Sequence, residues 1–417
     1  MNDMSLNLRV RLSVMMFLQY MLFAVWWQPL AAYVKTMGVE GWQLALILSS
    51  MPLGCLVSPL ICMIADRHFA SQKVLIVLNF ICAVLLLLAA KVGSPVMLFA
   101  CLLLAMFCYM PTWSLTNAIA MANTPSEKFP QIRVFGSIGW VASGAFGFIA
   151  LKAFDKTIDG TSVPLLCGAA TAFVAGLVNL TLPNTPPPSK GKPASVVDAL
   201  GLRALTLMKD RNFAGFIFLS MLMMIPFTMY WSYFSVFLTD KGFTLLSGTM
   251  NWGQFVEMFL MLLVPVALAK LGVKKTMLMG LVALVVRYVS FWIAGQADIS
   301  FMVYAGILVH GAIFGFFIVG GQVYVDKKAP AEMRAQAQGL IGLICFGVGM
   351  LIGNFFNGKL IEIYTSEELV EGVSTVQYNW NAIWMITTLI SVAVLVAFLL
   401  FFKEDTTEIQ IEAVEAA

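Results

Sequence analysis

Charged side chains are scarce in this sequence. Only 11% of its 417 residues are Asp, Glu, Lys or Arg, and 60% are hydrophobic, whereas an ordinary soluble domain has roughly 25% charged residues. No water-soluble core hides that much apolar surface. Apolar runs recur along the whole chain, many of them close to the roughly 20 residues that a helix needs to cross the hydrocarbon layer of a membrane. The composition therefore predicts an all-α integral membrane protein.

The sequence also lacks the motifs of common catalytic and metal sites. It has only two histidines, and we find no P-loop, no H-E-x-x-H motif and no nucleophile elbow. We therefore expect no enzyme, no cofactor and no metal ion, and a net charge of +3 gives no indication of nucleic-acid binding. None of the cysteines forms a CxxC pair, so we interpret all seven as small core residues rather than disulfide partners or metal ligands: Cys55, Cys62, Cys82, Cys101, Cys108, Cys167 and Cys345.

Breaks at charged, Gly or Pro clusters divide the apolar sequence into membrane spans. The first apolar run is too long for a signal peptide and lacks a small-residue cleavage site, so we expect it to be a retained helix. The pattern predicts twelve spans, at residues 10–34, 42–65, 72–91, 96–121, 133–153, 163–182, 213–238, 246–269, 275–294, 299–325, 335–361 and 380–402. An even number of spans places both ends of the chain on the same side.

The distribution of Lys and Arg predicts the orientation, because cationic loops resist translocation. If the N-terminus is cytoplasmic, most of the basic residues lie in cytoplasmic loops. The opposite side then has only Lys35, Lys91, Lys152, Lys156, Lys241 and Lys359. We therefore expect a multi-pass protein of the inner (cytoplasmic) membrane with both termini in the cytoplasm.

A polar stretch near the middle of the chain, from about Pro183 to Asn212, contains three consecutive prolines and divides the spans into two sets. A Pro-containing helix end and a short basic turn follow the second expected span, and the same pattern follows the eighth, half a chain later. Parallel six-helix repeats of this kind are typical of one large transporter class. The expected organisation is a six-helix half at 1–182, a cytoplasmic linker at 183–212, a second six-helix half at 213–403 and a cytoplasmic tail at 404–417.

The turn after the second span resembles a motif of the major facilitator superfamily, G-x-x-x-D-R-x-G-R-R, that clamps neighbouring helix ends. Asp66 and Arg67 stand at the matching positions, but Cys62 replaces the first Gly. The resemblance implies the major facilitator fold, with Asp66 and Arg67 in a structural or charge-pair role. Asp66 is either a conformational latch or a solvated charge, and neither interpretation makes it a substrate ligand.

A narrower resemblance extends from end to end of the chain. Several segments, in order, are similar to the nucleoside:proton symporter family. They are Phe17-Leu18-Gln19, Trp26-Trp27, Tyr109-Met110-Pro111-Thr112, the stretch from Phe129 to Gly139 and the stretch from Arg334 to Leu340. The segment Phe-Pro-x-Ile-Arg-x-x-Gly-Ser-Ile-Gly is the most specific. The family implies import of a nucleoside together with a proton.

Polar residues inside the spans are the candidates for transport chemistry, since a charge at the bilayer centre costs about 2.5–3.5 kcal/mol on insertion scales. Arg133, Ser137 and Trp140 follow one another at helical spacing and share one face, which suits ribose hydroxyls and a stacked base. The alternative is that Arg133 extends to the cytoplasmic interface. The family resemblance implies a substrate-site Arg at the matching position.

The expected span 246–269 has a polar stripe that includes Gln254 and Glu257. The Gln254 amide both donates and accepts hydrogen bonds, as the edge of a nucleobase requires. Glu257 lies well inside the span, and we interpret it as a substrate contact and the proton-coupling group. The alternative is a permanent ion pair with Arg287 or Arg133. Arg287 is the only charge in its span and needs a partner, for which Glu257 is the obvious candidate.

The expected span 299–325 presents His310 and Phe314 on one face, and we predict both as substrate-site residues. The family usually has Tyr at the His310 position and Asp at the Gly315 position, so a carboxylate expected near the site is missing. His310 titrates near neutrality and is a second candidate for proton coupling; a fixed hydrogen-bond donor is the alternative. Thr228 and Trp231 occupy positions where the family has substrate-binding amides, and we predict both as substrate contacts. With Tyr230 and Tyr233 they form either an aromatic wall that stacks a base or part of an ordinary interfacial belt.

The leading hypothesis is therefore a proton-coupled nucleoside importer that works by alternating access, as a monomer. One alternative is a major facilitator transporter of another small polar solute, such as a sugar or a modified nucleoside. A membrane-embedded enzyme or receptor is disfavoured by the missing catalytic motifs and by the lack of a large soluble domain.

Overall fold

A computed structural model describes residues 5–125, 128–187, 195–296, 299–330, 333–370 and 373–403. Nearly all of these residues are helical, and the one short sheet is an antiparallel hairpin in which Thr365 pairs with Tyr378. The expected tail at 404–417 and part of the expected linker lie outside the described residues. The cysteines are all free thiols, buried or half-buried.

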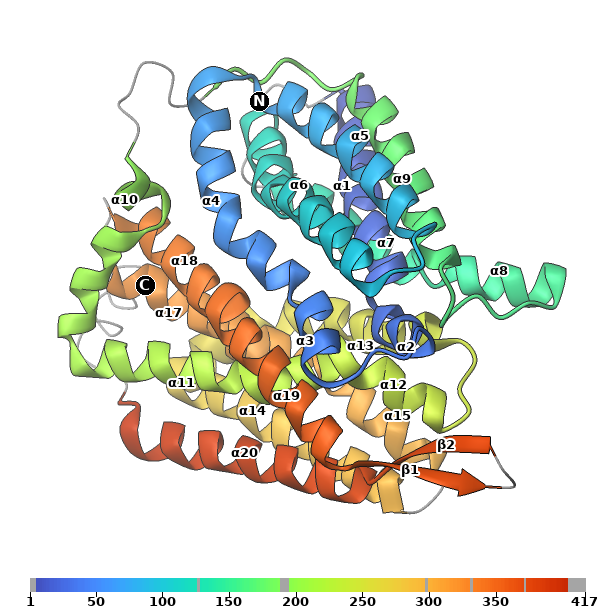
Figure 1. Cartoon of the computed structure of the whole chain (residues 1–417). Coiled ribbons are helices and arrows are strands. Elements are labelled where there is room, and N and C mark those ends of the chain that lie inside the picture. The colour runs from blue at the N-terminus through green and yellow to red at the C-terminus, as the bar shows by residue number, and fades with distance from the viewer. Residues whose placement is uncertain are drawn as a thin grey trace.

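The helices of the first 182 residues pack together as one bundle, in the upper part of Figure 1. In it, α1 contacts α7 and α9, while α5 packs between α6 and α9 and α4 packs along α6. Several spans are broken into two helices, for example at Pro29 and at Ser49. The helices are α1 (Leu6–Trp27), α2 (Leu30–Thr36), α3 (Gly41–Leu48), α4 (Ser50–His68), α5 (Ser71–Ala89), α6 (Pro95–Ala122), α7 (Phe129–Ala142), α8 (Ala145–Phe154) and α9 (Val163–Asn179).

The helices after the linker form a second bundle, in the lower part of Figure 1. Short π-helical turns interrupt three of its spans. The linker contains α10 (Val196–Ala199) and the 3-10 helix η2 (Leu202–Lys209). The bundle consists of α11 (Arg211–Thr228), η3 (Met229–Tyr233), α12 (Phe234–Asp240), α13 (Leu246–Leu260), η4 (Met261–Leu263), α14 (Val264–Gln296), α15 (Ser300–Leu308), α16 (His310–Ala312), η5 (Ile313–Val319), α17 (Gly320–Lys328), α18 (Arg334–Gly342), η7 (Leu343–Gly349), α19 (Met350–Ile363), the strands β1 (Thr365–Val370) and β2 (Val373–Tyr378), and α20 (Trp380–Phe401).

Ten helical stretches in the described residues are long and apolar enough to cross a membrane, where the sequence predicted twelve. Two expected spans lie in one stretch, Leu246–Gln296, which contains a non-helical residue at Gly272 (φ 78°, ψ 174°). The expected span 163–182 corresponds to the shorter apolar helix Val163–Asn179. The count of twelve therefore stays a prediction, and the multi-pass helical fold is confirmed.

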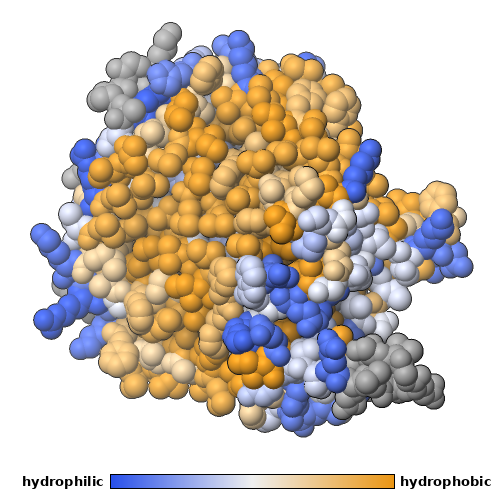
Figure 2. All heavy atoms as spheres, viewed as in Figure 1, coloured by the Kyte–Doolittle hydropathy of each residue, from blue (hydrophilic) through white to orange (hydrophobic). Residues whose placement is uncertain are grey.

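The outer surface of the two bundles is apolar. Figure 2 shows a broad hydrophobic surface across the middle of the molecule, with hydrophilic side chains gathered at its margins. Large apolar side chains such as Leu389, Leu400 and Phe401 are at least 60% exposed. Exposed apolar surface of this extent is stable only in contact with lipid.

Hydrogen bonds between the described parts of the two bundles lie toward the end where α2 meets α3. The Asn354 amide donates to the Ser49 hydroxyl (3.3 Å), and the Ala32 backbone N–H donates to the Ser235 hydroxyl (3.3 Å). Helix α19 also packs closely against α3 at Gly358. A Cβ atom at Gly358 would lie only 2.9 Å from the Cβ atom of Ala45, so a larger residue does not fit there. The two halves are therefore joined at this end.

Candidate functional site

A pocket between the two halves is lined mainly by aromatic side chains. The first half contributes Trp27, Gln28 and Trp140, and the second contributes Tyr230, Trp231, Met250, Gln254 and His310. The space between these side chains amounts to about 250 Å³, part of it open to the surroundings. Ligand sites in membrane transporters lie at the interface between the repeats, which is where this pocket is found.

Two tryptophans, one from each half, contact each other at this pocket. The ring centroids of Trp140 and Trp231 are 5.4 Å apart, and Trp231 also stacks on Phe227 (5.6 Å) and on His310 (6.2 Å). Trp231 lies in the π-helical turn η3, directly after a helix that contains Pro226. Such turns frequently mark functional sites. Stacked rings of this kind suit a flat aromatic ligand.

A chain of polar side chains leads from the pocket wall into the second bundle. Nη2 of Arg287 lies 2.8 Å from Nδ1 of His310, and Nε2 of His310 lies 3.5 Å from Oε2 of Glu257. A guanidinium only donates hydrogen bonds, so Nδ1 accepts and the neutral ring carries its proton on Nε2, facing Glu257. Gln254 donates from Nε2 to the same carboxylate oxygen at 2.9 Å. Gln254 and His310 therefore contact Glu257 and also line the pocket.

The direct ion pair expected between Arg287 and Glu257 is not formed, because the His310 ring lies between the two side chains. Arg287 is fully buried. Its Nε donates to the Gly306 carbonyl oxygen at 3.1 Å, and its Cζ lies 4.0 Å above the Tyr230 ring. The imidazole therefore mediates the pairing that the sequence predicted as a single contact.

Two glycines allow helices α13 and α16 to pack closely enough for this chain. A side chain at Gly311 would collide with the backbone of Glu257, and one at Gly253 would lie 2.8 Å from the Ile307 carbonyl oxygen. Small residues at helix contacts let backbones approach in this way. The packing brings the 6%-exposed Glu257 beside His310, which is 1% exposed.

The expected Arg133 face is only partly assembled at the pocket. Trp140 lines the pocket, while Ser137 and Arg133 are half-buried, about one and two turns away on α7. The Arg133 guanidinium lies 4.4 Å above the Tyr20 ring, and its charge acts on the Glu257 carboxylate. Arg133 therefore influences the site electrostatically without lining the pocket.

The structure does not bring Thr228 and Phe314 to the pocket wall. The Thr228 hydroxyl donates to the Met224 carbonyl oxygen at 2.6 Å and packs against Gly353. The π-helical turn that begins at Met229 breaks the α-helical alignment that would place Thr228 on the Trp231 face. Phe314 lies behind His310, with ring centroids 6.3 Å apart.

Sequence reasoning missed Trp27, Gln28 and Met250 as pocket residues, and it named Tyr230 only as part of a possible aromatic wall beside Trp231. Gln28 had a detectable signal: it is an amide within the first apolar run, directly before Pro29. Asp66 and Arg67 lie in the last turn of α4, where Arg67 donates to the Met63 carbonyl oxygen at 3.0 Å, and neither lines the pocket. Their role as a latch stays a prediction.

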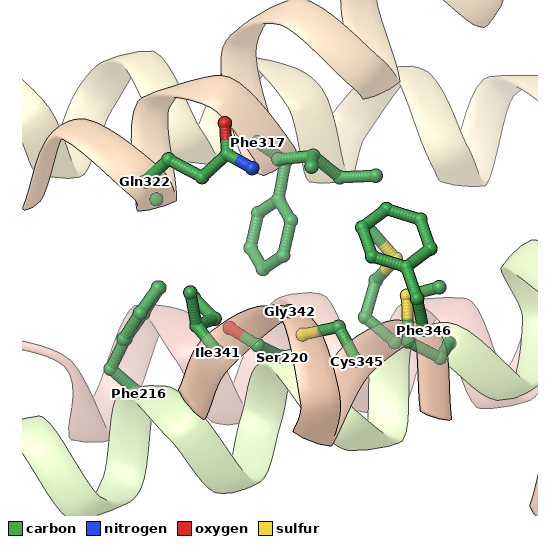
Figure 3. A pocket seen from close by; sticks show the side chains of 12 residues that line it. Phe216, Ser220, Phe317, Gln322, Ile341, Gly342, Cys345 and Phe346 are labelled. Atoms are coloured by element: carbon green, nitrogen blue, oxygen red, sulfur yellow. The ribbon is translucent and has the colours of Figure 1, made fainter. Parts of the chain in front are cut away.

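A second, larger pocket of about 350 Å³ lies within the second bundle alone. Figure 3 shows Phe317 and Gln322 on one side of it and Phe216, Ser220, Ile341 and Cys345 on the other. Its walls are mostly apolar, and none of the predicted site residues lines it. The pocket between the halves is therefore the candidate transport site.

Comparison with known proteins agrees with this geometry. The family model described as "Nucleoside H+ symporter" matches residues 5–407. The chain is 39% identical over 407 residues to the putative nucleoside transporter YegT of Escherichia coli K12, covering 96% of this chain and 95% of that protein. It is 28% identical over 417 residues to the nucleoside permease NupG of the same organism, covering 95% and 96%.

Solved structures show the same fold. A crystal structure of the nucleoside transporter NupG matches with a TM-score of 0.82 at 28% identity, covering 96% of this chain and all of that one. A crystal structure of a D-xylose-proton symporter matches with a TM-score of 0.70 at 13% identity, over 95% and 98% of the two chains, which shows the fold alone. The chain has the major facilitator fold and belongs to the nucleoside:H+ symporter family.

Proposed function

We propose that this chain imports nucleosides together with protons by alternating access, with Glu257 as the proton-binding group. The observation that carries the proposal is the placement of Gln254 and His310. Both line the pocket, and both contact the Glu257 carboxylate. A change in the protonation of Glu257 thus alters the hydrogen bonds that these two side chains offer to a bound solute.

The substrate side of the proposal depends on the pocket walls. Trp140 and Trp231 offer aromatic faces for a base, and the polar atoms of Gln254 and His310 suit its edge or the ribose hydroxyls. Each half contributes one of the two tryptophans, so a stacked base contacts both halves. A ligand held in this way favours a rearrangement in which the halves move together around it.

The proton side depends on a balance of charge around Glu257. The carboxylate is buried, which disfavours its ionised form, whereas Arg287 and Arg133 act on it as positive charges. Either protonation state is therefore accessible. One charge that moves through 100 mV contributes about 2.3 kcal/mol, enough to drive accumulation.

The proposed setting is the inner membrane, with the protein as a monomer and both termini in the cytoplasm, as the Lys and Arg distribution predicts. In this orientation the end where α2 meets α3 faces away from the cytoplasm. The two halves are joined at that end, so we infer that this end separates the pocket from the extracytoplasmic side.

Replacement of Glu257 by Gln tests the proton-coupling role. We expect proteoliposomes that contain Glu257→Gln to exchange labelled nucleoside across the membrane but to lose uphill accumulation driven by an inward proton gradient. Asp155→Asn is the matched control, because Asp155 is exposed at the end of α8 and does not line the pocket. Undiminished gradient-driven accumulation by Glu257→Gln contradicts the assignment.

The substrate class is tested by competition in the wild-type protein. Unlabelled uridine and adenosine should reduce uptake of a labelled nucleoside, whereas xylose and glucose should not. Sugar competition with no nucleoside competition favours the alternative cargo that the sequence left open.

A further inference from the structure

Gln28, at the end of α1, has an acceptor atom without a donor at the pocket. It lines the pocket between the halves, it is only 6% exposed, and its Oε1 atom has no hydrogen-bond partner among the described residues. Its other polar atom is occupied, because Nε2 donates to Oδ1 of Asn251 at 3.0 Å. The amide therefore contributes a buried acceptor without a donor to the wall of the pocket.

The orientation of this amide follows from its neighbours. Nδ2 of Asn251 lies 3.0 Å from the Val141 carbonyl oxygen and 3.5 Å from the Ser143 hydroxyl. A carbonyl oxygen only accepts hydrogen bonds, so the NH₂ group of Asn251 must face it. Oδ1 of Asn251 then faces Gln28 and requires a donor. The carbonyl of Val141 thus fixes both amides and leaves Oε1 of Gln28 unpaired.

A buried acceptor without a donor is unfavourable and calls for an explanation. Three of the other pocket residues have unsatisfied donors, because the indole N–H groups of Trp27, Trp140 and Trp231 are buried without an acceptor among the described residues. The pocket therefore contains one unsatisfied acceptor together with unsatisfied donors. A nucleobase with a ring N–H next to a carbonyl group, as in uracil or hypoxanthine, presents the complementary set.

We propose that Gln28 is a specificity-determining residue, whose Oε1 accepts a hydrogen bond from the ring N–H of an oxo-substituted nucleobase. The inference rests on the proposed function and names the part of the substrate that this site recognises. The carbonyl groups beside that N–H take the indole donors of Trp140 and Trp231. A base methylated on this ring nitrogen lacks the donor and leaves Gln28 unpaired.

The first experiment uses the wild-type protein and needs no variant. Uptake of labelled uridine into proteoliposomes is measured in competition with unlabelled 3-methyluridine and 5-methyluridine. These compounds have the same size, but only the first has lost the ring N–H. We expect 5-methyluridine to compete about as well as uridine, and 3-methyluridine to compete at least roughly fivefold less well, the size expected for one lost hydrogen bond. Inosine and 1-methylinosine form the corresponding purine pair.

The second experiment separates the acceptor from the bridge to Asn251. Gln28→Met removes both, whereas Asn251→Ala removes the bridge and keeps Oε1. We expect Gln28→Met to transport 3-methyluridine and uridine within about twofold of each other, and Asn251→Ala to retain the wild-type discrimination.

Three outcomes overturn the assignment. They are equal competition by 3-methyluridine and 5-methyluridine in the wild type, full discrimination by a transporting Gln28→Met variant, and equal loss of discrimination in both variants. The wild-type competition remains decisive if Gln28→Met does not fold. A wild type that takes up none of these nucleosides overturns the proposed function itself, and with it this assignment.

Discussion

Asp159 of the first half accepts two hydrogen bonds from Ser247 of the second. The Ser247 backbone N–H lies 3.0 Å from Oδ2, and the hydroxyl oxygen lies 3.2 Å from Oδ1. Asp159 is in the loop between α8 and α9, and Ser247 is in the first turn of α13. A carboxylate at a helix N-terminus stabilises the helix. Here it also joins the two halves.

This contact predicts a pH dependence. Burial raises the pKa of Asp159 above its ordinary value of 3.8, and the bonds from Ser247 oppose this without cancelling it. Cys167 on α9 is the titratable neighbour. Because the folded state binds the proton more tightly than the unfolded chain, the contribution of Asp159 to stability is fully present below pH 3.8 and falls as pH rises through the raised pKa. The thermal midpoint of the wild type relative to Asp159→Asn should therefore fall from about pH 4 upward.

Asp210 provides a control of opposite sign. It caps α11 through the Asn212 backbone N–H at 2.8 Å, and Lys328 lies 2.9 Å from its other oxygen. The hydrogen bond from Lys328 lowers the pKa of Asp210 below 3.8. Its contribution is present above pH 3.8 and is lost as pH falls through the lowered pKa. The advantage of the wild type over Asp210→Asn should thus shrink on acidification. The same direction for both variants would contradict the assignment.

The chain through His310 predicts energetic coupling between Arg287 and Glu257 without direct contact. Arg287→Met leaves His310 without its donor and removes one of the two positive charges that act on Glu257. It should destabilise the protein by up to about 3–5 kcal/mol, the usual cost of breaking a buried charge pair. Adding Glu257→Gln removes the uncompensated carboxylate. The double variant should therefore be more stable, by about 0.5–3 kcal/mol, than the sum of the two single destabilisations predicts.

Thermal unfolding in detergent measures this cycle. The matched control pairs Arg287→Met with Glu362→Gln, which is exposed and lies at the joined end. That pair should be additive. If the destabilisations caused by Arg287→Met and Glu257→Gln are additive as well, His310 does not couple Arg287 to Glu257.

Much of the fold was predictable because a helix that crosses the lipid bilayer must be apolar over most of its length. Each span needs a long apolar run, so its place can be read from composition, and a polar residue within a run marks a site. Glu257, Gln254 and His310 carried that signal, and the structure brings them together. Their role in transport stays a prediction, since residue identity indicates chemistry and not motion.

The remainder depended on packing that no pattern specifies. Thr228 was predicted from its match to a family position, but the π-helical turn after it changes which residues share a face. The direct pair of Arg287 and Glu257 was predicted from charge alone, and the position of the His310 ring between them follows from the close approach at Gly311. Gln28 was missed because an amide in a largely apolar run says nothing of its partner on a distant helix.

The close packing at Gly358 allows the stability of the joined end to be changed by one substitution. A Cβ atom at this position would meet the Ala45 Cβ and the Tyr233 hydroxyl at 2.9 Å, and the Gly41 carbonyl oxygen at 3.0 Å. Gly358→Val should therefore destabilise the joined conformation by about 1–3 kcal/mol, the usual cost of overpacking, and lower its population relative to the opposite state by roughly five- to 150-fold.

The variant should slow nucleoside uptake, because the substrate leaves toward the cytoplasm only while the opposite end is joined. Labelling of a cysteine introduced at Ser235, whose hydroxyl accepts from the Ala32 backbone N–H across the two halves, reports the opening, and the native cysteines are replaced beforehand. We expect faster labelling from the extracytoplasmic side in Gly358→Val than in its parent. Gly339→Val is the matched control, because a side chain at Gly339 meets nothing within 4 Å. Unchanged labelling together with unchanged uptake in Gly358→Val would mean that the contact between α3 and α19 does not form the extracytoplasmic gate.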